Sequence, residues 1–341
     1  MKYAFPLAAV IALILIALIG VQIPGMQYLF GVFIPYVATM VFVAGFIYRV
    51  YNWGKSPVPF RIPTTCGQGF SLPWIKQDKL DCPATKVQVL GRMLLEILLF
   101  RSLWRNTKAT MYEGPQLTYE SSKWLWLFGI VFHYSFLIIV LRHLRLFLEP
   151  VPACVAFVEV LDSLLQVGAP LMYITDATVL LALLLLFLRR LWNPHVRYIS
   201  LANDYFPLFL ILAIVCTGIL MRYFLRSHVD IEAIKQLAIG LVTLHPTIVA
   251  KISPLFYVHL FLVSVLLVYF PFSKLMHMGG VFLSPTRNLP NDSRMRRHIN
   301  PWNPPIRPHS YASYEDEFRA DMVEQGIPVD RPLSKEAGAA N

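Results

Sequence analysis

Four histidines lie in or at the edge of hydrophobic segments of this 341-residue chain, where ionisable side chains are costly and usually functional. His133 and His143 are ten residues apart, and His259 and His277 are 18 residues apart. On an α-helix these intervals correspond to about 15 Å and about 27 Å along the axis. Because neutral imidazole is a common metal ligand, the residue type and its setting indicate metal chemistry inside a membrane.

The pairing of the histidines follows from the direction of their segments. The segment with His133 and His143 is expected to run from inside to outside, and the segment with His259 and His277 in the opposite direction. His143 and His259 then lie near the outer face, and His133 and His277 near the inner face. Because 18 residues make five full turns, we place His259 and His277 on one face of one helix, which Pro271 kinks. Tilt and that kink are expected to absorb the difference between the two intervals.

Two histidines at each of two depths are typical of bis-histidine haem b, whose iron takes one axial nitrogen from each helix. We therefore predict two haem b groups. Zinc fits less well, because it takes four clustered ligands. Two alternatives stay open at this point: a proton relay, which would favour interspersed Asp and Glu, and plain hydrogen bonds between helices.

The composition indicates an integral membrane protein. Hydrophobic residues make up 56% of the chain and charged residues only 15%, and the hydrophobic residues come in long blocks. The net charge of +10 would suit a nucleic-acid-binding protein, but the basic residues lie between the hydrophobic blocks, as in cytoplasmic loops of membrane proteins. The four cysteines form no CxxC or CxxCH motif, which argues against covalently attached haem.

We predict an all-α integral membrane protein with about six transmembrane helices, four of which form a haem-binding bundle. Lys and Arg are frequent between the second and third hydrophobic segments, in 189–204 and after residue 280, and absent from 22–27 and 146–170. Both termini are therefore expected in the cytoplasm, with the chain multi-pass in the cytoplasmic (inner) membrane. The first segment is expected to be a retained helix rather than a cleaved signal. The predicted spans are 5–23, 28–48, 124–147, 171–192, 205–225 and 254–276.

These spans divide the chain into four regions. The long loop contains a hydrophobic stretch with interspersed charges, 89–107, which predicts a helix at the cytoplasmic interface or against a partner subunit. Residues 151–168 predict a similar helix on the outer side. In the polar, proline-rich tail, YEDEFRADMVEQ predicts a short helix, and the tail is expected to be disordered alone or docked on a soluble partner. The regions are 1–48, two spans; 49–123, a cytoplasmic loop; 124–280, a four-helix dihaem domain; and 281–341, the cytoplasmic tail.

Haem carries two propionates, which cations can bind. Arg142 and Arg145 are candidates at the outer haem, and their alternative role is snorkelling to the outer interface. Four basic residues are candidates near the inner face, and their alternative role is ordinary anchoring at the cytoplasmic interface. These candidates are Arg189, Arg190, Arg197 and Lys274.

Residues 124–280 resemble the cytochrome b subunits of the respiratory nitrate reductase gamma type. Their pattern is a His-x9-His helix followed later by a His-x17-His helix, as in HYSFLIIVLRH (133–143) and HLFLVSVLLVYFPFSKLMH (259–277). The resemblance implies the same two histidine pairs as the topology. The flanking residues that match are Pro271, Phe272, Ser273 and Lys274 before the last histidine, and Arg189, Arg190, Pro194, Arg197 and Asp204 between the two helices.

Two departures from that family concern its quinone site. The gamma subunits have a glycine immediately before the second histidine, where this chain has Arg142. They also have a lysine about 20 residues further on, where this chain has Ser163. The departures leave the haem ligands untouched and concern only the residues of the quinone pocket.

Other segments resemble the M subunits of the sulfite-reduction-associated Dsr complexes (DsrMKJOP). They are RIPTTCGQGFSLPWIKQDKLDCP (61–83), VLGRMLLEILLFRSLWRNT (89–107) and the tail. The resemblance implies a menaquinone-linked membrane anchor with two haems b. It also implies a cytoplasmic iron–sulfur subunit (DsrK-like), a second membrane subunit (DsrP-like), a periplasmic multihaem cytochrome c (DsrJ-like) and an iron–sulfur protein (DsrO-like). The thiol–disulfide protein DsrC would be the cytoplasmic substrate.

The expected function is electron transfer between menaquinol or menaquinone near the outer face and the cytoplasmic iron–sulfur partner, in either direction. The alternatives are a proton-coupled transporter with a histidine relay, a scaffold without cofactor, and a gamma-like subunit of a different quinol-linked oxidoreductase. The transporter is disfavoured because the spans lack buried carboxylates apart from Asp176 and show no inverted repeat. The quinone-site candidates at the outer depth are Arg142, Arg145, Glu149 and Tyr257.

Overall fold

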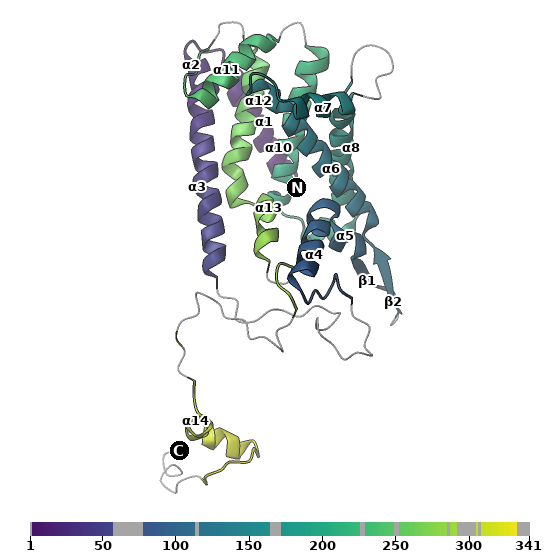
Figure 1. Cartoon of the computed structure of the whole chain (residues 1–341), viewed down its shortest axis with the longest axis vertical. Coiled ribbons are helices and arrows are strands. Elements are labelled where there is room, and N and C mark those ends of the chain that lie inside the picture. Colours follow the sequence, from purple (N-terminus) through teal and green to yellow (C-terminus); the bar gives the residue numbers. More distant parts are fainter. Residues whose placement is uncertain are drawn as a thin grey trace. The chain divides into compact units, whose positions relative to one another are not determined.

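The computed structural model describes residues 2–56, 78–112, 116–163, 172–225, 229–248, 252–284, 287–291, 305 and 308–332. The chain divides into two units, one formed by Met1–Ser56 with Phe60–Arg297 and the other by Pro57–Pro59 with His298–Asn341 (Figure 1). Residues 61–77, with Cys66 and most of the first Dsr-like segment, lie outside the described residues.

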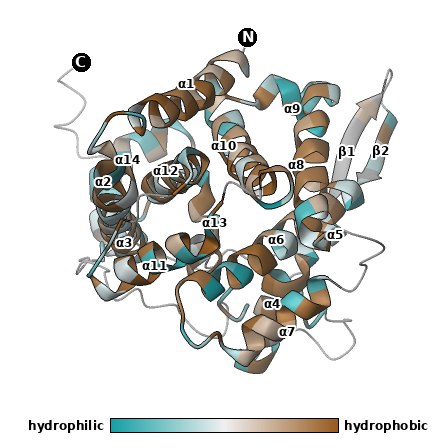
Figure 2. Ribbon diagram, turned by 90° about the horizontal axis from the view of Figure 1, so that it is seen from above, coloured by the Kyte–Doolittle hydropathy of each residue, from teal (hydrophilic) through white to brown (hydrophobic). Residues whose placement is uncertain are grey.

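The larger unit is a bundle of long hydrophobic helices, and Figure 2 shows them as hydrophobic over most of their length. Helix α6 packs against α8, α8 against α10, and α12 against α1, α3 and α10. Between α1, α10 and α12 the side chains of Ala17, Leu210 and Leu262 are fully buried. The helices of the bundle are α1 (Ala4–Gly20), α3 (Ile34–Lys55), α6 (Lys123–His143), α8 (Ile174–Trp192), α10 (Ala202–Ile219) and α12 (Pro254–Tyr269).

Four helical segments of the described chain are long and apolar enough to cross a bilayer: Met26–Lys55, Lys123–Leu146, Ala202–Phe224 and Pro254–Phe272. They coincide with four of the six predicted spans. The other two predicted spans are also helical, but α1 has only 17 residues, and α8 carries Asp176 and two arginines. The membrane character and mostly helical fold are thus confirmed, whereas six complete spans stay a prediction.

The shorter elements depart from the expected ones in several places. The helix expected over 89–107 is wrong in its extent, because α4 (Lys86–Leu99) ends at Phe100, whose φ of 49° lies in the left-handed region, before α5 (Arg101–Arg105) begins. An antiparallel hairpin that the sequence did not suggest follows, β1 (Thr107–Tyr112) with β2 (Gln116–Ser121). The remaining short helices are α2 (Met26–Tyr28), α7 (Ala153–Asp162), α9 (Pro194–Ile199), α11 (Ile231–Thr243) and α13 (His277–Gly280).

The smaller unit contains α14 (Tyr311–Glu324), which falls on the stretch predicted to form a short helix. The chain after α14 folds back on it, and the backbone N–H groups of Asp330 and Arg331 donate to the buried carboxylate of Glu315 at 2.8 and 3.1 Å. Arg319 also donates to Glu315, at 3.1 Å. These hydrogen bonds, the one from Asp330 first, hold the pKa of Glu315 below its ordinary value.

Candidate functional site

His143 and His259, the pair predicted near the outer face and called the outer pair below, are brought together by α6 and α12. His143 is the last residue of α6, and His259 lies in the second turn of α12. Their ring centroids are 6.4 Å apart, and the ring planes are within 10° of parallel. The two helices therefore bring two nearly parallel imidazoles together, with their centroids too far apart for direct stacking.

The inner pair is brought together by a break in the chain after α12. His133 lies in the middle of α6, and His277 is the first residue of α13. Their ring centroids are 5.9 Å apart, and the ring planes are nearly perpendicular, at 88°. The expectation that His259 and His277 share one helix face is wrong, because α12 ends at Tyr269 and the chain continues through tight turns with Ser273 extended.

The break has a local physical cause. Pro271 removes a backbone donor from the helix and restricts the residue before it, so the helix cannot continue as a regular α-helix. The chain then leaves the helical axis at Ser273, whose φ and ψ are −117° and 178°. The 18-residue interval therefore need not span about 27 Å, and His277 returns to the level of His133. The fit of two unequal intervals is achieved by this turn rather than by a kink in one helix.

All four rings are anchored through the same nitrogen. Nδ1 of His133, His143 and His277 lies 2.7, 2.7 and 3.0 Å from the backbone carbonyl oxygens of Gly129, Ile139 and Lys274, respectively. A carbonyl oxygen only accepts hydrogen bonds, so Nδ1 carries the proton and Nε2 keeps a free lone pair. Metal-binding histidines are commonly held in this way, with the nitrogen that does not bind the metal donating its proton to a carbonyl or carboxylate oxygen.

The fourth ring, that of His259, uses a side chain instead. Its Nδ1 lies 2.9 Å from Oγ1 of Thr217 on α10. The Thr217 hydroxyl donates its proton to the carbonyls of Ala213 and Ile214, each at 2.9 Å, and therefore accepts from Nδ1–H. Thr217 is thus a functional residue that the sequence reasoning missed, because a threonine in a hydrophobic helix carries no signal of its partner.

The ring spacing fits axial ligation of one metal between the rings of each pair. With metal–nitrogen bonds of about 2.0–2.1 Å and about 1.1 Å from each nitrogen to its ring centre, two axial imidazoles have centroids roughly 6.3 Å apart. The observed 6.4 and 5.9 Å lie close to that value. Gly218 lies beside the outer pair, and even a Cβ there would make only an ordinary contact, 3.6 Å, with His259 Cε1, so the space next to the ring is not tightly filled. The residues present fit haem.

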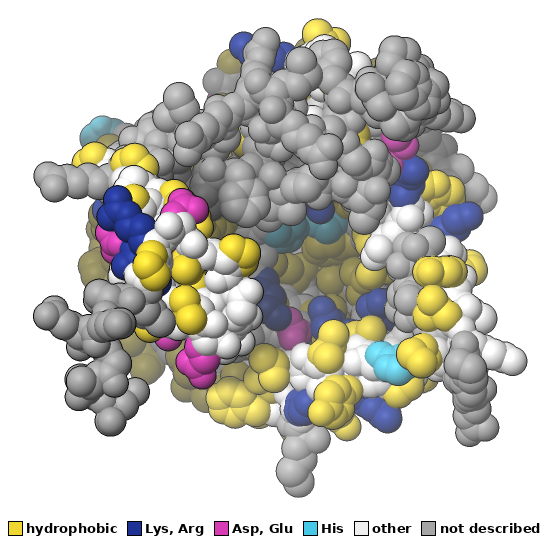
Figure 3. Space-filling view, turned by 90° about the horizontal axis from the view of Figure 1, so that it is seen from below, with side chains coloured by type: hydrophobic (Ala, Val, Ile, Leu, Met, Phe, Trp, Pro, Cys, Tyr) yellow, Lys and Arg dark blue, Asp and Glu magenta, His cyan; other side chains and the backbone are white. Residues whose placement is uncertain are grey.

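Figure 3 shows the end of the bundle seen from below. The surface is hollowed there, and histidine side chains lie inside the hollow among hydrophobic ones, with Lys and Arg side chains around it. Among the propionate candidates, Lys274 pairs with Asp204 at 2.7 Å and Arg190 donates to Ser200 at 3.0 Å. Arg189 lies beside Arg190 in the last turn of α8, and Arg197 lies in α9. Their role at propionates stays a prediction.

The quinone-site candidates all have structural partners. Arg145 pairs with Glu159, and Glu149 pairs with Lys235. Tyr257 is 1% exposed and packs in the hydrophobic core. Arg142, the residue that the gamma subunits replace by glycine, is buried in a charged network described below. The role of these four residues at a quinone stays a prediction.

Comparison with known proteins identifies the family of the chain. Residues 93–292, which include all four histidines, match the model of the nitrate reductase gamma subunit family. A protein of Archaeoglobus fulgidus, named as an Hdr-like menaquinol oxidoreductase cytochrome b-like subunit, is 49% identical over 283 residues, 81% of this chain and 84% of the relative. A protein of the same name from Archaeoglobus profundus is 42% identical over 278 residues, 80% of this chain and 82% of the relative. The chain therefore belongs to the nitrate reductase gamma subunit family.

Proposed function

We propose that the chain is the dihaem cytochrome b subunit of a quinol-linked membrane oxidoreductase. The observation that carries the proposal is the pair of histidine pairs, with ring centroids 6.4 and 5.9 Å apart and every Nδ1 engaged. His143 with His259 would hold the outer haem b, and His133 with His277 the inner one. Bound there, haem b supplies one-electron redox chemistry.

The protein's own residues fix which nitrogen is presented and how the rings are turned. The carbonyl oxygens of Gly129, Ile139 and Lys274 and the hydroxyl of Thr217 hold the Nδ1 protons, so each ring offers only Nε2. Phe100 packs edge-on against His133, with ring centroids 5.0 Å apart. Anchored rings also argue against a proton relay, in which each ring must exchange its proton between two nitrogens.

The electron donor and acceptor are proposed from the family resemblance and from the names of the relatives. Menaquinol would be oxidised near the outer pair, its two protons would leave to the outside, and its electrons would pass to a cytoplasmic iron–sulfur subunit. The partner proteins would be the DsrK-, DsrP-, DsrJ- and DsrO-like subunits, and the thiol–disulfide substrate a DsrC-type protein. The chain would span the cytoplasmic membrane with both termini in the cytoplasm. The reverse direction, quinone reduction driven by thiol oxidation, uses the same sites.

A reduced-minus-oxidised visible spectrum of the purified protein, with pyridine haemochrome quantification, tests the proposal. We expect a b-type band and two haems per chain. His143→Ala and His277→Ala should each leave one haem, and the matched variants His245→Ala and His309→Ala should leave two. Absence of a b-type band from membranes that contain the protein would refute the proposal. Reduction of the haems by a soluble menaquinol analogue in the intact complex then tests the quinol assignment.

A further inference from the structure

The residue immediately before the outer ligand is a buried arginine held by two carboxylates. Nη2 of Arg142 lies 2.6 Å from Oδ1 of Asp176, and Nε lies 3.1 Å from Oδ2 of Asp162. The side chain of Arg142 is only 8% exposed, that of Asp176 13% and that of Asp162 2%. We call Arg142, Asp162 and Asp176 the Arg142 clamp. Its three members come from the ends of α6, α7 and α8.

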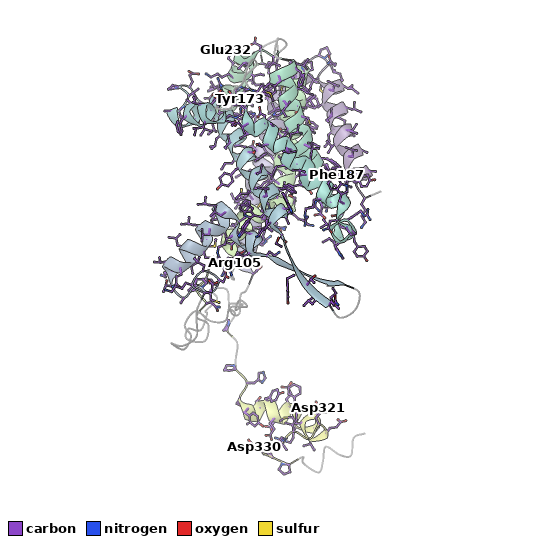
Figure 4. The ribbon with its side chains drawn as sticks, turned by 90° about the vertical axis from the view of Figure 1, so that its right-hand side faces the viewer. Arg105, Tyr173, Phe187, Glu232, Asp321 and Asp330 are labelled. Atoms are coloured by element: carbon purple, nitrogen blue, oxygen red, sulfur yellow. The ribbon has the colours of Figure 1, made fainter. Side chains whose placement is uncertain are left out.

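Further hydrogen bonds complete the clamp. Asp162 accepts from the backbone N–H and the hydroxyl of Thr175, at 2.9 and 2.6 Å. Asp176 accepts from the hydroxyl of Tyr223 at 2.8 Å. The ring of Tyr173 lies 3.9 Å from the guanidinium carbon of Arg142 and 3.9 Å from that of Arg222. Figure 4 shows Tyr173 at the same end of the bundle as Glu232 and far from Arg105.

Stability alone does not explain such a clamp. Each buried ion costs several kcal/mol of desolvation, and well-packed hydrophobic residues are often equally stabilising in place of a buried ion pair. Nε of Arg142 is close enough to Asp162 for an ion pair but makes no hydrogen bond. What a buried ionic network does provide is a fixed relative position of the groups that carry it. Here it fixes the end of α6 against α7 and α8.

The fixed helix end also fixes the outer ligand. His143 follows Arg142 directly, and its ring is hydrogen-bonded to the carbonyl oxygen of Ile139 in the same helix. The ring therefore turns with the end of α6. The partner ring of His259 is held from α10 through Thr217. The angle between the two rings consequently depends on how α6 is oriented within the bundle.

We propose that Arg142 is a positioning residue whose clamp keeps the outer imidazole planes nearly parallel. The inference rests on the proposed function, because the angle has a chemical consequence only when both rings bind one haem iron. Parallel axial planes split the d-orbitals of low-spin ferric haem widely and produce a rhombic electron paramagnetic resonance signal. Perpendicular planes leave two of these orbitals close in energy and produce a strongly anisotropic signal. The angles of 10° and 88° therefore assign one signal of each kind to the wild-type protein.

The experiment is electron paramagnetic resonance of the oxidised full-length protein, with haem quantification on the same samples. Arg142→Ala should shift or broaden the rhombic signal and leave the anisotropic signal unchanged. Arg142→Lys, which keeps the positive charge, should restore at least half of the wild-type rhombic intensity. Asp176→Asn, which keeps a hydrogen-bonding group of the same shape, should cause an intermediate shift. Lys235→Ala breaks an ion pair that does not involve the clamp and should change neither signal.

The outcomes separate this inference from the proposed function. A wild-type protein without low-spin haem signals contradicts the proposed function itself. Two wild-type signals with an unchanged rhombic signal in Arg142→Ala and Asp176→Asn overturn the role of the clamp. Loss of the outer haem in Arg142→Ala, with the inner haem kept and with rescue by Arg142→Lys, supports it. If Arg142→Ala loses both haems, Asp176→Asn decides, and an unshifted rhombic signal in that variant overturns the inference.

Discussion

The hydroxyl of Thr217 is the part of the outer site whose removal can be predicted most sharply. Thr217→Val keeps the volume and β-branching of the side chain but removes the oxygen that accepts from Nδ1–H of His259 at 2.9 Å. Thr217 is buried, at 6% exposed, so water does not readily replace the lost acceptor. The substitution therefore leaves a buried donor without its partner and frees the ring to rotate.

The size of the effect follows from that single hydrogen bond. An unpaired buried donor costs about 1–3 kcal/mol. The carbonyl oxygen of Ile214 accepts from the Thr217 hydroxyl at 2.9 Å and is also within hydrogen-bonding reach of His259, so it can take over part of the bond. We therefore expect a loss of about 1–2 kcal/mol, which lowers the affinity for the outer haem roughly 5- to 30-fold. A weaker acceptor at Nδ1 also makes the imidazole less basic, so the outer midpoint potential should rise.

Haem transfer to excess apomyoglobin measures the affinity, and a spectroelectrochemical titration measures the potentials. The control is Thr39→Val, because Thr39 makes the same bond to its own helix, to the carbonyl of Pro35 at 2.8 Å, without a histidine partner. Only Thr217→Val should lose the outer haem faster, and the inner potential should stay constant. Equal outer-haem affinity and potential in wild type and Thr217→Val would refute the assigned hydrogen bond.

Three further predictions test the surroundings of the site and the tail. Phe100→Gly removes the strain of a left-handed residue, about 1–2 kcal/mol, but also removes the ring that packs against His133. Because the two effects oppose each other, we expect nearly unchanged thermal stability but an altered spectrum of the inner haem. An unaltered spectrum would contradict the packing role of Phe100. Gly45→Ala places a Cβ 2.8 Å from Pro271, so it should lower the free energy of unfolding by about 1–3 kcal/mol and perturb the inner haem. An unchanged melting temperature would show instead that α3 shifts to make room for the Cβ. Because the pKa of Glu315 is held below its ordinary value of 4.5, the ionised carboxylate stabilises the tail above pH 4.5, and this stabilisation is lost as the pH falls through the lowered pKa. Hydrogen exchange of the α14 amides, corrected for the intrinsic exchange rate, should therefore rise in wild type as the pH falls through that value. In Glu315→Gln the corrected exchange should not change with pH over the same range.

Sequence patterns were sufficient for the hydrophobic helices and for the histidine pairs. Long apolar blocks and the distribution of Lys and Arg determine helix direction, and antiparallel direction alone matches His143 with His259 and His133 with His277. The structure brings these partners within 5.9 to 6.4 Å. The short helix of the tail was also predictable, because charged and helix-forming residues fill it without an interrupting proline or glycine.

Features that depend on tertiary packing were not predictable from the sequence. The helix breaks at Phe100, a residue with no turn preference. The break is held by the backbone N–H and the hydroxyl of Ser102, which both donate to the carboxylate of Glu96. Arg142 drew attention only as a departure from glycine, since its partners, Asp162 and Asp176, are 20 and 34 residues away along the chain. One sequence carries no record of such distant contacts.

The difference between the two pairs can be traced to the chain after α12. His143 and His259 lie on regular, antiparallel helices, where an imidazole anchored to its own or a neighbouring helix keeps a direction set by the bundle. His277 follows the extended Ser273 and is anchored to Lys274, three residues before it, in a tight turn. Its ring direction is therefore set by the turn and not by α12. Because the turn is what brings His277 to the level of His133, the perpendicular inner planes are a consequence of fitting an 18-residue interval against a ten-residue one. A variant that straightened this turn would move His277 away from His133 before it could make the planes parallel.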